Sequence, residues 1–271
     1  MNAMNPISKM AFYCCGVRMQ DAQDVHPVCG DIYAKVFMNE TGLQIFKAFR
    51  EERKADTSNI VRHRIIDDFL RQALSVHSNL CLVIIGAGFD SRAYRLEGGL
   101  WVELDEPQVI SRKNERLPAS ECVNELHRIP IKFSTDSLAD KLSFFSSQSP
   151  VVVIIEGVFM YLEQNEISLL LRTLRQIFPQ HQLICDLMNR KFFEKYSRSL
   201  YETIKAMGTS FKTVADRPEE IFIENGYHCT ETISIVERTV ELGKIRIPRI
   251  ILNKFLRVLA KGYSIYVFTS K

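Results

Sequence analysis

The chain has 271 residues, of which 46% are hydrophobic and 25% are charged, and its formal net charge is +3. This length and composition predict one domain, 1–271, with a full α/β core, and the weak positive charge does not favour a nucleic-acid partner. No apolar segment approaches the roughly 18 residues of a membrane-spanning helix, so we expect no membrane partner. The seven cysteines are odd in number and include no Cys-x-x-Cys pair, which favours reduced thiols, a cytoplasmic location and no metal site.

Residues 1–78 form the first predicted unit, a helical cap. In the stretch IVRHRIIDDFLRQAL, apolar residues recur at helical spacing from Ile60 to Leu74. From residue 79 onward, apolar strands alternate with helices, which predicts right-handed crossovers and a parallel sheet. This core spans 79–271, and a long helical insert interrupts it at 190–226.

Seven strands are predicted from the apolar runs. They span residues 80–86, 100–105, 123–129, 151–157, 181–188, 228–236 and 263–270. The helices are predicted at 106–116, 135–144, 163–178, 190–207 and 247–260. Because the last predicted element is a strand, we expect an antiparallel edge on an otherwise mostly parallel sheet.

A run of basic residues accompanies the last predicted helix. Its members are Lys244, Arg246, Arg249, Lys254, Arg257 and Lys261. We interpret the run as a solvated helix face, with a contact surface for a partner as the alternative.

The stretch IIGAGFDSRAYRL contains the clearest functional signal, a glycine turn directly after a buried strand. Ligands of open parallel sheets bind beyond the carboxyl ends of the strands, near the switch in strand order. Three carboxylates occupy such positions: Asp90 follows the glycines, Asp105 ends the second strand and Glu156 ends the fourth. We therefore expect a ligand site that these acids share.

The surroundings of the turn favour a cationic ligand over a pyrophosphate. Ser91 stands where the dinucleotide pattern Gly-x-Gly-x-x-Gly has its third glycine. A pyrophosphate needs a helix N-terminus without nearby anions, but Asp90 lies in the turn itself. S-adenosylmethionine carries a sulfonium and an ammonium, which nearby acids would stabilise.

Each acid also has a purely structural interpretation. Asp105 could be the N-cap of the following helix, and Glu156 could be a solvated strand end or the partner of an arginine. Arg92 and Arg95 could pair with local acids.

With these residues in view, the chain resembles the leucine carboxyl methyltransferase family, especially its bacterial branch of polyketide-type O-methyltransferases. The resemblance covers roughly residues 18–270. Its motifs are DIYAKVF, RHRIIDD, GAGFDSRAYRL, VELDEPQVISRK, EGVFMYL and YSIYVFTS. It implies the Rossmann-like, seven-stranded α/β fold of class I S-adenosylmethionine-dependent methyltransferases, with an N-terminal helical lid and an antiparallel edge strand.

The resemblance also assigns roles to individual residues. Arg62 would meet the methionine carboxylate of the cofactor, Asp105 the ribose hydroxyls and Glu156 the amino acid portion. Asp90 would support the loop or the ammonium. The methionine moiety would be lined by Gly86, Ala87 and Gly88.

Two parts of the family pattern are missing or displaced. Lys132 stands near the acid that the family uses to hold adenine, and Asp136 is a loose substitute for that acid. The basic residue of the family's N-terminal contact maps onto Arg18.

For the acceptor side, the sequence offers Tyr161, just beyond Glu156, with a core aromatic as the alternative. We expect His63 on a helix surface, with an entry into the site as the alternative. Aromatic residues of the insert could roof an apolar substrate or pack as ordinary amphipathic helices. They are Phe192, Phe193, Tyr196, Tyr201 and Phe211.

The leading hypothesis is an S-adenosylmethionine-dependent O-methyltransferase acting on a carboxyl or hydroxyl group of a small molecule. One alternative is methylation of a protein C-terminus. Others are a nicotinamide-dependent oxidoreductase and a non-catalytic cofactor-binding protein. The oligomeric state is left open, with a homodimer among the options.

Overall fold

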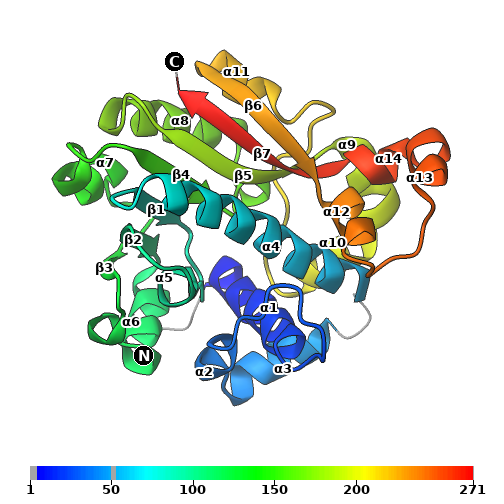
Figure 1. Cartoon of the computed structure of the whole chain (residues 1–271), viewed down its shortest axis with the longest axis horizontal. Helices are drawn as coiled ribbons and strands as arrows, with labels where there is room; N and C mark the ends of the chain where they lie inside the picture. Colours follow the sequence, from blue (N-terminus) through cyan, green and yellow to red (C-terminus); the bar gives the residue numbers. More distant parts are fainter. Residues whose placement is uncertain (1–4, 50–52, 271) are drawn as a thin grey trace.

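The computed structural model describes residues 5–49 and 53–270. It begins with the helices α1 (Pro6–Asp21), α2 (Ala34–Phe37), α3 (Glu40–Ala48) and α4 (Arg53–Val76). The predicted cap, 1–78, includes residues 1–4 and 50–52, which lie outside the described residues. Helices α1 to α3 lie together below the sheet, whereas α4 runs across it (Figure 1).

A seven-stranded sheet forms the centre of the molecule, in the order β3-β2-β1-β4-β5-β7-β6. Its strands are β1 (Cys81–Ile85), β2 (Leu100–Asp105), β3 (Glu125–Pro130), β4 (Val151–Ile155), β5 (Gln182–Met188), β6 (Tyr227–Ser234) and β7 (Tyr263–Ser270). Only β7 runs against its neighbours. The predicted sheet is confirmed, although the antiparallel strand lies one place in from the edge, between β5 and β6.

Alternating side chains of the strands feed two cores. Leu82 and Ile84 of β1 pack on one face of the sheet with Val61 and Ile65 of α4. Val83 and Ile85 point to the other face, whose core includes Leu171 of α8 (Gln164–Ile177). Because side chains of a strand alternate between faces, the apolar run of a central strand fills both cores.

The remaining helices connect the strands. They are α5 (Arg92–Arg95), α6 (Pro107–Arg116), α7 (Leu138–Leu142), α8 (Gln164–Ile177), α9 (Arg190–Phe192), α10 (Arg198–Ala206), α11 (Glu220–Glu224), α12 (Ile235–Glu241), α13 (Arg249–Phe255) and α14 (Arg257–Lys261). Short 3₁₀ turns lie at η1 (Ala119–Glu121), η2 (Ser143–Phe145) and η3 (Phe159–Tyr161), and η4 (Phe193–Ser197) is a π-helix.

Two sequence predictions of helices need correction. The helix predicted at 190–207 is divided into α9, η4 and α10, and the one at 247–260 into α13 and α14. The predicted strand 228–236 runs too far, because Ser234 ends β6 and caps α12 by accepting a hydrogen bond from Glu237 N. No helix among the described residues is long and apolar enough to cross a membrane.

The N-terminal helices form a third apolar cluster over the glycine turn. The Phe12 ring of α1 lies 4.8 Å from the Phe89 ring, and Phe37 stacks on Phe89 at 5.2 Å. Tyr161 of η3 belongs to the same cluster. The cap therefore lies on the carboxyl ends of the central strands, where β1 pairs with both β2 and β4 and the chain order reverses.

Candidate active site

In the glycine turn after β1, other parts of the chain pack closely against the glycines. Gly86 and Gly88 adopt φ angles of +71° and +50°, which favour glycine. A Cβ on Gly86 would lie 2.6 Å from Cγ2 of Val158, and one on Gly88 would lie 3.3 Å from Cβ of Ala11 in α1. The glycines therefore permit close packing of the neighbouring loop and of the cap. Ala87 lies between them, and its N–H donates to Leu104 O at 3.0 Å.

Asp105 is the last residue of β2 and faces this turn. Its Oδ2 accepts a hydrogen bond from Gly88 N, and its Oδ1 accepts one from Glu106 N, both at 2.6 Å. The side chain is buried, and this burial raises the pKa of Asp105 to about 6, against the opposing effect of the two N–H donors. The N-cap of α6 is Glu106, so the alternative of Asp105 as a helix cap is wrong.

Arg62 of α4 reaches the ends of β4 and β5. Its Nε donates to Glu156 at 3.0 Å, and its Nη1 donates to Asp186 at 3.1 Å and to the Tyr263 hydroxyl at 2.8 Å. The Tyr263 hydroxyl in turn donates to Asp186 at 2.7 Å. No hydrogen bond from Nη2 to the described residues is recorded, although Arg62 is only 8% exposed. That nitrogen is thus the donor left for a ligand.

Arg92 of α5 is the centre of a second set of ion pairs. Its guanidinium contacts Asp90, Asp67 at 2.6 Å and Glu156 at 2.8 Å. Burial alone would raise the pKa of Asp90, but Arg92 together with other neighbours, which include Lys113 and Arg18, outweighs burial and lowers the pKa on balance. Asp90 and Glu156 are therefore ionised and already neutralised by arginine.

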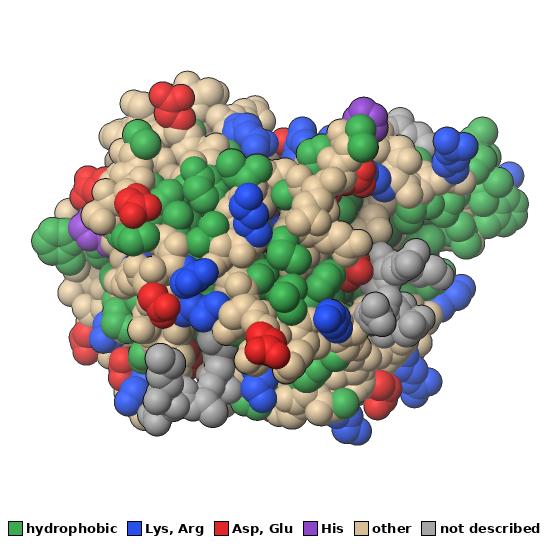
Figure 2. Space-filling view, turned by 90° about the horizontal axis from the view of Figure 1, so that it is seen from below, with side chains coloured by type: hydrophobic (Ala, Val, Ile, Leu, Met, Phe, Trp, Pro, Cys, Tyr) green, Lys and Arg blue, Asp and Glu red, His purple; other side chains and the backbone are tan. Residues whose placement is uncertain are grey.

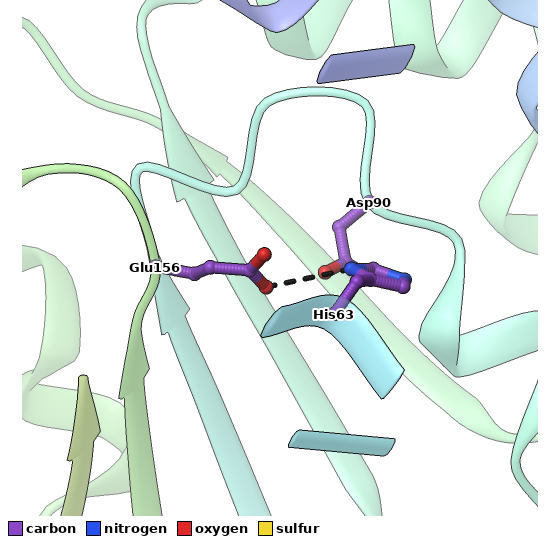
Figure 3. Close-up of side chains that lie close together, drawn as sticks. All are labelled: His63, Asp90 and Glu156. Carbon is purple, nitrogen blue, oxygen red and sulfur yellow. Dashed lines mark ion pairs between the residues drawn. The ribbon is translucent and has the colours of Figure 1, made fainter. Parts of the chain in front are cut away.

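His63, Asp90 and Glu156 point toward one another, and their potential ligand atoms lie within 4.8 Å (Figure 3). The cation at this point is the guanidinium of Arg92, whose Nη2 lies 2.7 Å from His63 Nδ1. Burial lowers the pKa of His63, and Arg92 lowers it further, which keeps the imidazole neutral at pH 7. The donor set thus suits an arginine, and the absence of a metal stays a prediction.

The expectation of His63 on a helix surface is wrong, because the side chain is only 1% exposed. Helix α4 buries a polar stripe as well as its apolar one. Asn59, His63 and Asp67 recur at every fourth residue and are all buried. His63 and Asp67 contact the buried Arg92 of α5, whereas Asn59 donates a hydrogen bond to Cys14 Sγ of α1. In the sequence, this four-residue spacing and the pair Arg92 and Arg95, three residues apart, could have indicated a buried polar cluster.

The loop after the glycine turn is held by ion pairs that the sequence analysis missed. Nε of Arg18 donates to Asp31 at 2.9 Å, and Nη2 of Arg18 donates to Phe89 O at 2.7 Å. Asp31 also accepts a hydrogen bond from the Ser91 hydroxyl. Arg95 donates to Asp67 at 2.6 Å, so the structural interpretation of both α5 arginines is confirmed.

The expected adenine side shows local contacts. Asp136 accepts a hydrogen bond from Lys132 N at 3.1 Å and lies 3.5 Å from Lys141 Nζ, so it stabilises its own turn. A contact of Asp136 with adenine stays a prediction.

A cavity of about 250 Å³ lies next to this network, between the end of β5 and the insert. Its wall includes Asp186, Met160, Met188 and two of the predicted roof aromatics, Phe193 and Phe211. Asp186 is thus shared between the wall of the cavity and the Arg62 ion pairs.

Tyr161 packs from the cap side against Phe211, which lines the cavity. Its ring lies 5.5 Å from the Phe211 ring. Burial, and to a lesser extent Cys14, raises the pKa of Tyr161 above its ordinary value. The phenol is therefore neutral and suited to donate a hydrogen bond.

Comparison with known proteins identifies several relatives. A Mycolicibacterium smegmatis protein described as a putative S-adenosyl-L-methionine-dependent methyltransferase is 28% identical over 181 residues, 60% of this chain and 61% of the relative. The tetracenomycin polyketide synthesis O-methyltransferase TcmP of Streptomyces glaucescens is 26% identical over 199 residues, 72% of this chain and 70% of TcmP. The chain thus spans about three fifths of the mycobacterial relative's length.

Two solved structures share the fold. A DUF574 family protein from Streptomyces avermitilis has a TM-score of 0.59 at 11% identity, covering 93% of this chain and 99% of that one. Magnesium protoporphyrin IX methyltransferase from Synechocystis, with bound SAH, has a TM-score of 0.51 at 12% identity, covering 87% and 97%. Both similarities concern the fold, which is that of class I methyltransferases.

The family comparison covers the glycine turn, Arg62, Asp105 and Glu156 in one continuous match over residues 13–175. That match spans more than half of the chain, which therefore belongs to the leucine carboxyl methyltransferase family.

Proposed function

We propose that this chain transfers the methyl group of S-adenosylmethionine to a carboxyl or hydroxyl oxygen of a small molecule. The observation that carries the proposal is Asp186, which pairs with Arg62 on one side and lines the cavity on the other. This links the expected cofactor site to an adjoining space for an acceptor. The description of TcmP as an O-methyltransferase supports oxygen as the atom methylated.

The residues at the strand ends fit the cofactor. Asp105 offers a buried carboxylate for the ribose hydroxyls, and Nη2 of Arg62 offers a donor for the methionine carboxylate. Contacts of Gly86, Gly88 and Glu156 with the cofactor are also part of this proposal.

Among side chains that are at most 12% exposed, five carboxylates and four guanidiniums meet in the network around this space, which leaves one negative charge to attract a cation. Arg71, which is 47% exposed, also lies 3.8 Å from Asp67 at the outside of the network. The carboxylates are Asp31, Asp67, Asp90, Glu156 and Asp186, and the guanidiniums are Arg18, Arg62, Arg92 and Arg95.

When bound, S-adenosylmethionine would supply an electrophilic methyl group on a sulfonium. The chain would contribute alignment and exclusion of water, which can lower a barrier by about 7–11 kcal/mol in favourable cases. Tyr161 would orient the acceptor oxygen through its neutral hydroxyl. A carboxylate acceptor needs no base, because it is ionised at pH 7, whereas a hydroxyl acceptor must lose a proton.

Calorimetry with S-adenosylhomocysteine tests the cofactor assignment. Wild type should bind, and Asp105→Asn should weaken binding at least about tenfold, because the amide loses the charge that accepts the ribose hydroxyls. Glu231→Gln, an exposed carboxylate on β6, is the matched control and should bind as wild type does. Unchanged affinity in Asp105→Asn would refute the assignment, and binding of NADH in its place would support an oxidoreductase.

Methyl transfer to oxygen is tested separately with radiolabelled cofactor. Small carboxylic acids and phenols are compared with a peptide that ends in a free leucine carboxylate. Label in the small molecules supports the proposal, and release of that label by mild base identifies an ester, because an ether is stable. Label in the peptide alone would establish the alternative of protein C-terminal methylation.

A further inference from the structure

The segment 242–262, which contains α13 and α14, carries an unusual concentration of positive charge. We call it the basic segment. It has no acidic residue, and its basic residues are Lys244, Arg246, Arg249, Lys254, Arg257 and Lys261. The whole chain has a net charge of +3, so the residues outside this segment carry a net charge of −3. The charge of the protein is thus strongly polarised toward one short stretch.

Helix α13 in this segment is apolar on two opposite faces. Leu252 is fully buried and packs in the core beneath α4 and α12. On the outer face, Ile250 is 76% exposed, Ile251 is 44% exposed and Phe255 is 72% exposed. An apolar face of a helix is normally covered by another part of the protein or by a partner. The outer face of α13 therefore has the composition of a buried surface.

Positive side chains lie beside this outer face. Lys254, Arg257 and Lys261 are exposed, and Nζ of Lys254 lies 5.9 Å from the centre of the Phe255 ring. For these three cations and Arg246, the structure records no ion pair within residues 5–49 and 53–270. Figure 2 shows the result as a hydrophobic patch at the right-hand end of the molecule, where α13 lies, with basic side chains beside it.

We propose that the basic segment docks on the surface of an anionic lipid bilayer. Ile250, Ile251 and Phe255 enter the boundary between headgroups and acyl chains, and Lys254 and Arg257 contact the anionic headgroups. Such a surface takes up both features at once, because apolar area and cationic charge add in the binding of interfacial helices.

Two other possible partners would each suit either the exposed apolar side chains or the cations of this surface, but not both. A second copy of the chain, paired through the same face, would bring two strongly cationic surfaces together. A nucleic acid would pair with the cations but leave the isoleucines and Phe255 in water. The proposal revises our expectation of no membrane partner, which excluded a spanning helix and not one that lies on the surface. It does not depend on the proposed function.

Vesicle co-sedimentation of the full chain tests this proposal. Vesicles of phosphatidylcholine alone are compared with vesicles in which about one third of the lipid is phosphatidylglycerol. We expect binding to the anionic vesicles, little to the neutral ones, and release as salt is raised to about 0.5 M.

Two variants separate the contributions. The double variant Ile250→Ser/Phe255→Ser removes exposed apolar area, and Lys254→Glu/Arg257→Glu reverses two exposed charges. Each should weaken binding at least about tenfold. Phe144→Ser is the matched control, because Phe144 is also exposed, at 79%, but lies in η2. It should bind as wild type does, and all variants should show the wild-type unfolding midpoint.

Three outcomes would overturn the proposal. If the wild-type protein stays in the supernatant with anionic vesicles, the basic segment does not bind a lipid surface. Equal binding to neutral vesicles would remove the role of the cations. Light scattering that shows a dimer of wild type and a monomer of the Phe255 variant, without vesicle binding, would assign the face to a second copy.

Discussion

The protein uses its basic side chains in two contrasting ways. At the ends of β4 and β5, Arg62 and Arg92 are buried, and each meets at least two carboxylates. In the basic segment, Lys254 and Arg257 are exposed beside apolar side chains. The buried arginines are needed for folding, because their removal leaves uncompensated carboxylates, whereas the exposed ones are free to meet a partner. The same residue types thus serve stability in one region and recognition in the other.

The largest expected effect follows from Arg92→Met. The substitution leaves Asp67, Asp90 and Glu156 buried with less compensation, so we expect a loss of about 3–5 kcal/mol in the free energy of unfolding. Urea unfolding followed by circular dichroism measures it. Arg217→Met is the control, because Arg217 is 65% exposed in its pair with Glu220, and it should change stability by less than about 0.5 kcal/mol. If both substitutions lowered the free energy of unfolding equally, buried and exposed cations would not differ in their contribution to stability.

A pair of glycine substitutions measures how tightly the turn is packed. Gly86→Ala introduces a Cβ 2.6 Å from Val158, whereas Gly243, at a similar φ of +70°, has no atom within 4 Å of the added Cβ. Both variants suffer backbone strain of about 1–2 kcal/mol, and Gly86→Ala should lose about 1–3 kcal/mol more from overpacking. If both variants unfold at the same urea concentration, the Val158 side chain moves aside without a cost in stability, and the turn is packed less tightly than its geometry indicates.

Asp105 makes ligand binding depend on pH. Its pKa is raised to about 6, so the carboxylate that would accept the ribose hydroxyls is lost below that pH. Affinity for S-adenosylhomocysteine should fall about tenfold for each pH unit below 6. Isothermal titration between pH 5 and 8 checks this, and Asp105→Asn should abolish the slope. A flat profile in wild type would contradict the prediction.

The raised pKa of Asp105 also affects the stability of the protein without ligand, and there a low pH is favourable. Because the pKa of Asp105 is higher in the folded chain than its ordinary value of 3.8, the folded chain binds more protons between pH 4 and 6. The contribution of Asp105 to stability therefore increases as the pH falls through 6. Urea unfolding of wild type and Asp105→Asn at pH 5 and pH 8 separates this contribution from those of other groups.

The smallest expected effect is on the stability of Phe255→Ser. The side chain is 72% exposed, so the free energy of unfolding should change by less than about 0.5 kcal/mol, even though vesicle binding should weaken. Thermal unfolding beside vesicle sedimentation checks both. A loss above 1 kcal/mol would show that Phe255 supports the fold and is not free for a partner.

The sheet could be predicted because the apolar runs are local. The runs that became β2 and β7 have the observed bounds, Asp105 ends β2 and Glu156 follows β4. Both acids lie at the edge where ligands of open parallel sheets bind. The helical insert was harder to predict, because a single amphipathic pattern does not reveal the π-helix at Phe193–Ser197.

The sequence allowed Glu156, Arg92 and Arg95 to form ion pairs, but their partners could not be predicted, because the paired residues are far apart in the sequence. Arg62 meets Asp186 across 124 residues and Tyr263 across 201. In the sequence, Asp90 and Glu156 look like free acids available to a cation. In the structure Arg92 pairs with both, so in our proposal the attraction for a sulfonium would come from the net charge of the buried part of the network.

The contact between Arg62 and Tyr263 also has a consequence for biosynthesis. The ribosome adds about 5–20 residues per second, so 201 residues take roughly 10–40 s. During that time Arg62 lacks the Tyr263 hydroxyl, which contacts both Arg62 and Asp186 in the folded chain, and α4 lacks strand β7. The N-terminal half should therefore stay open to chaperones and proteases until β7 leaves the ribosome, and folding should be completed in one late step.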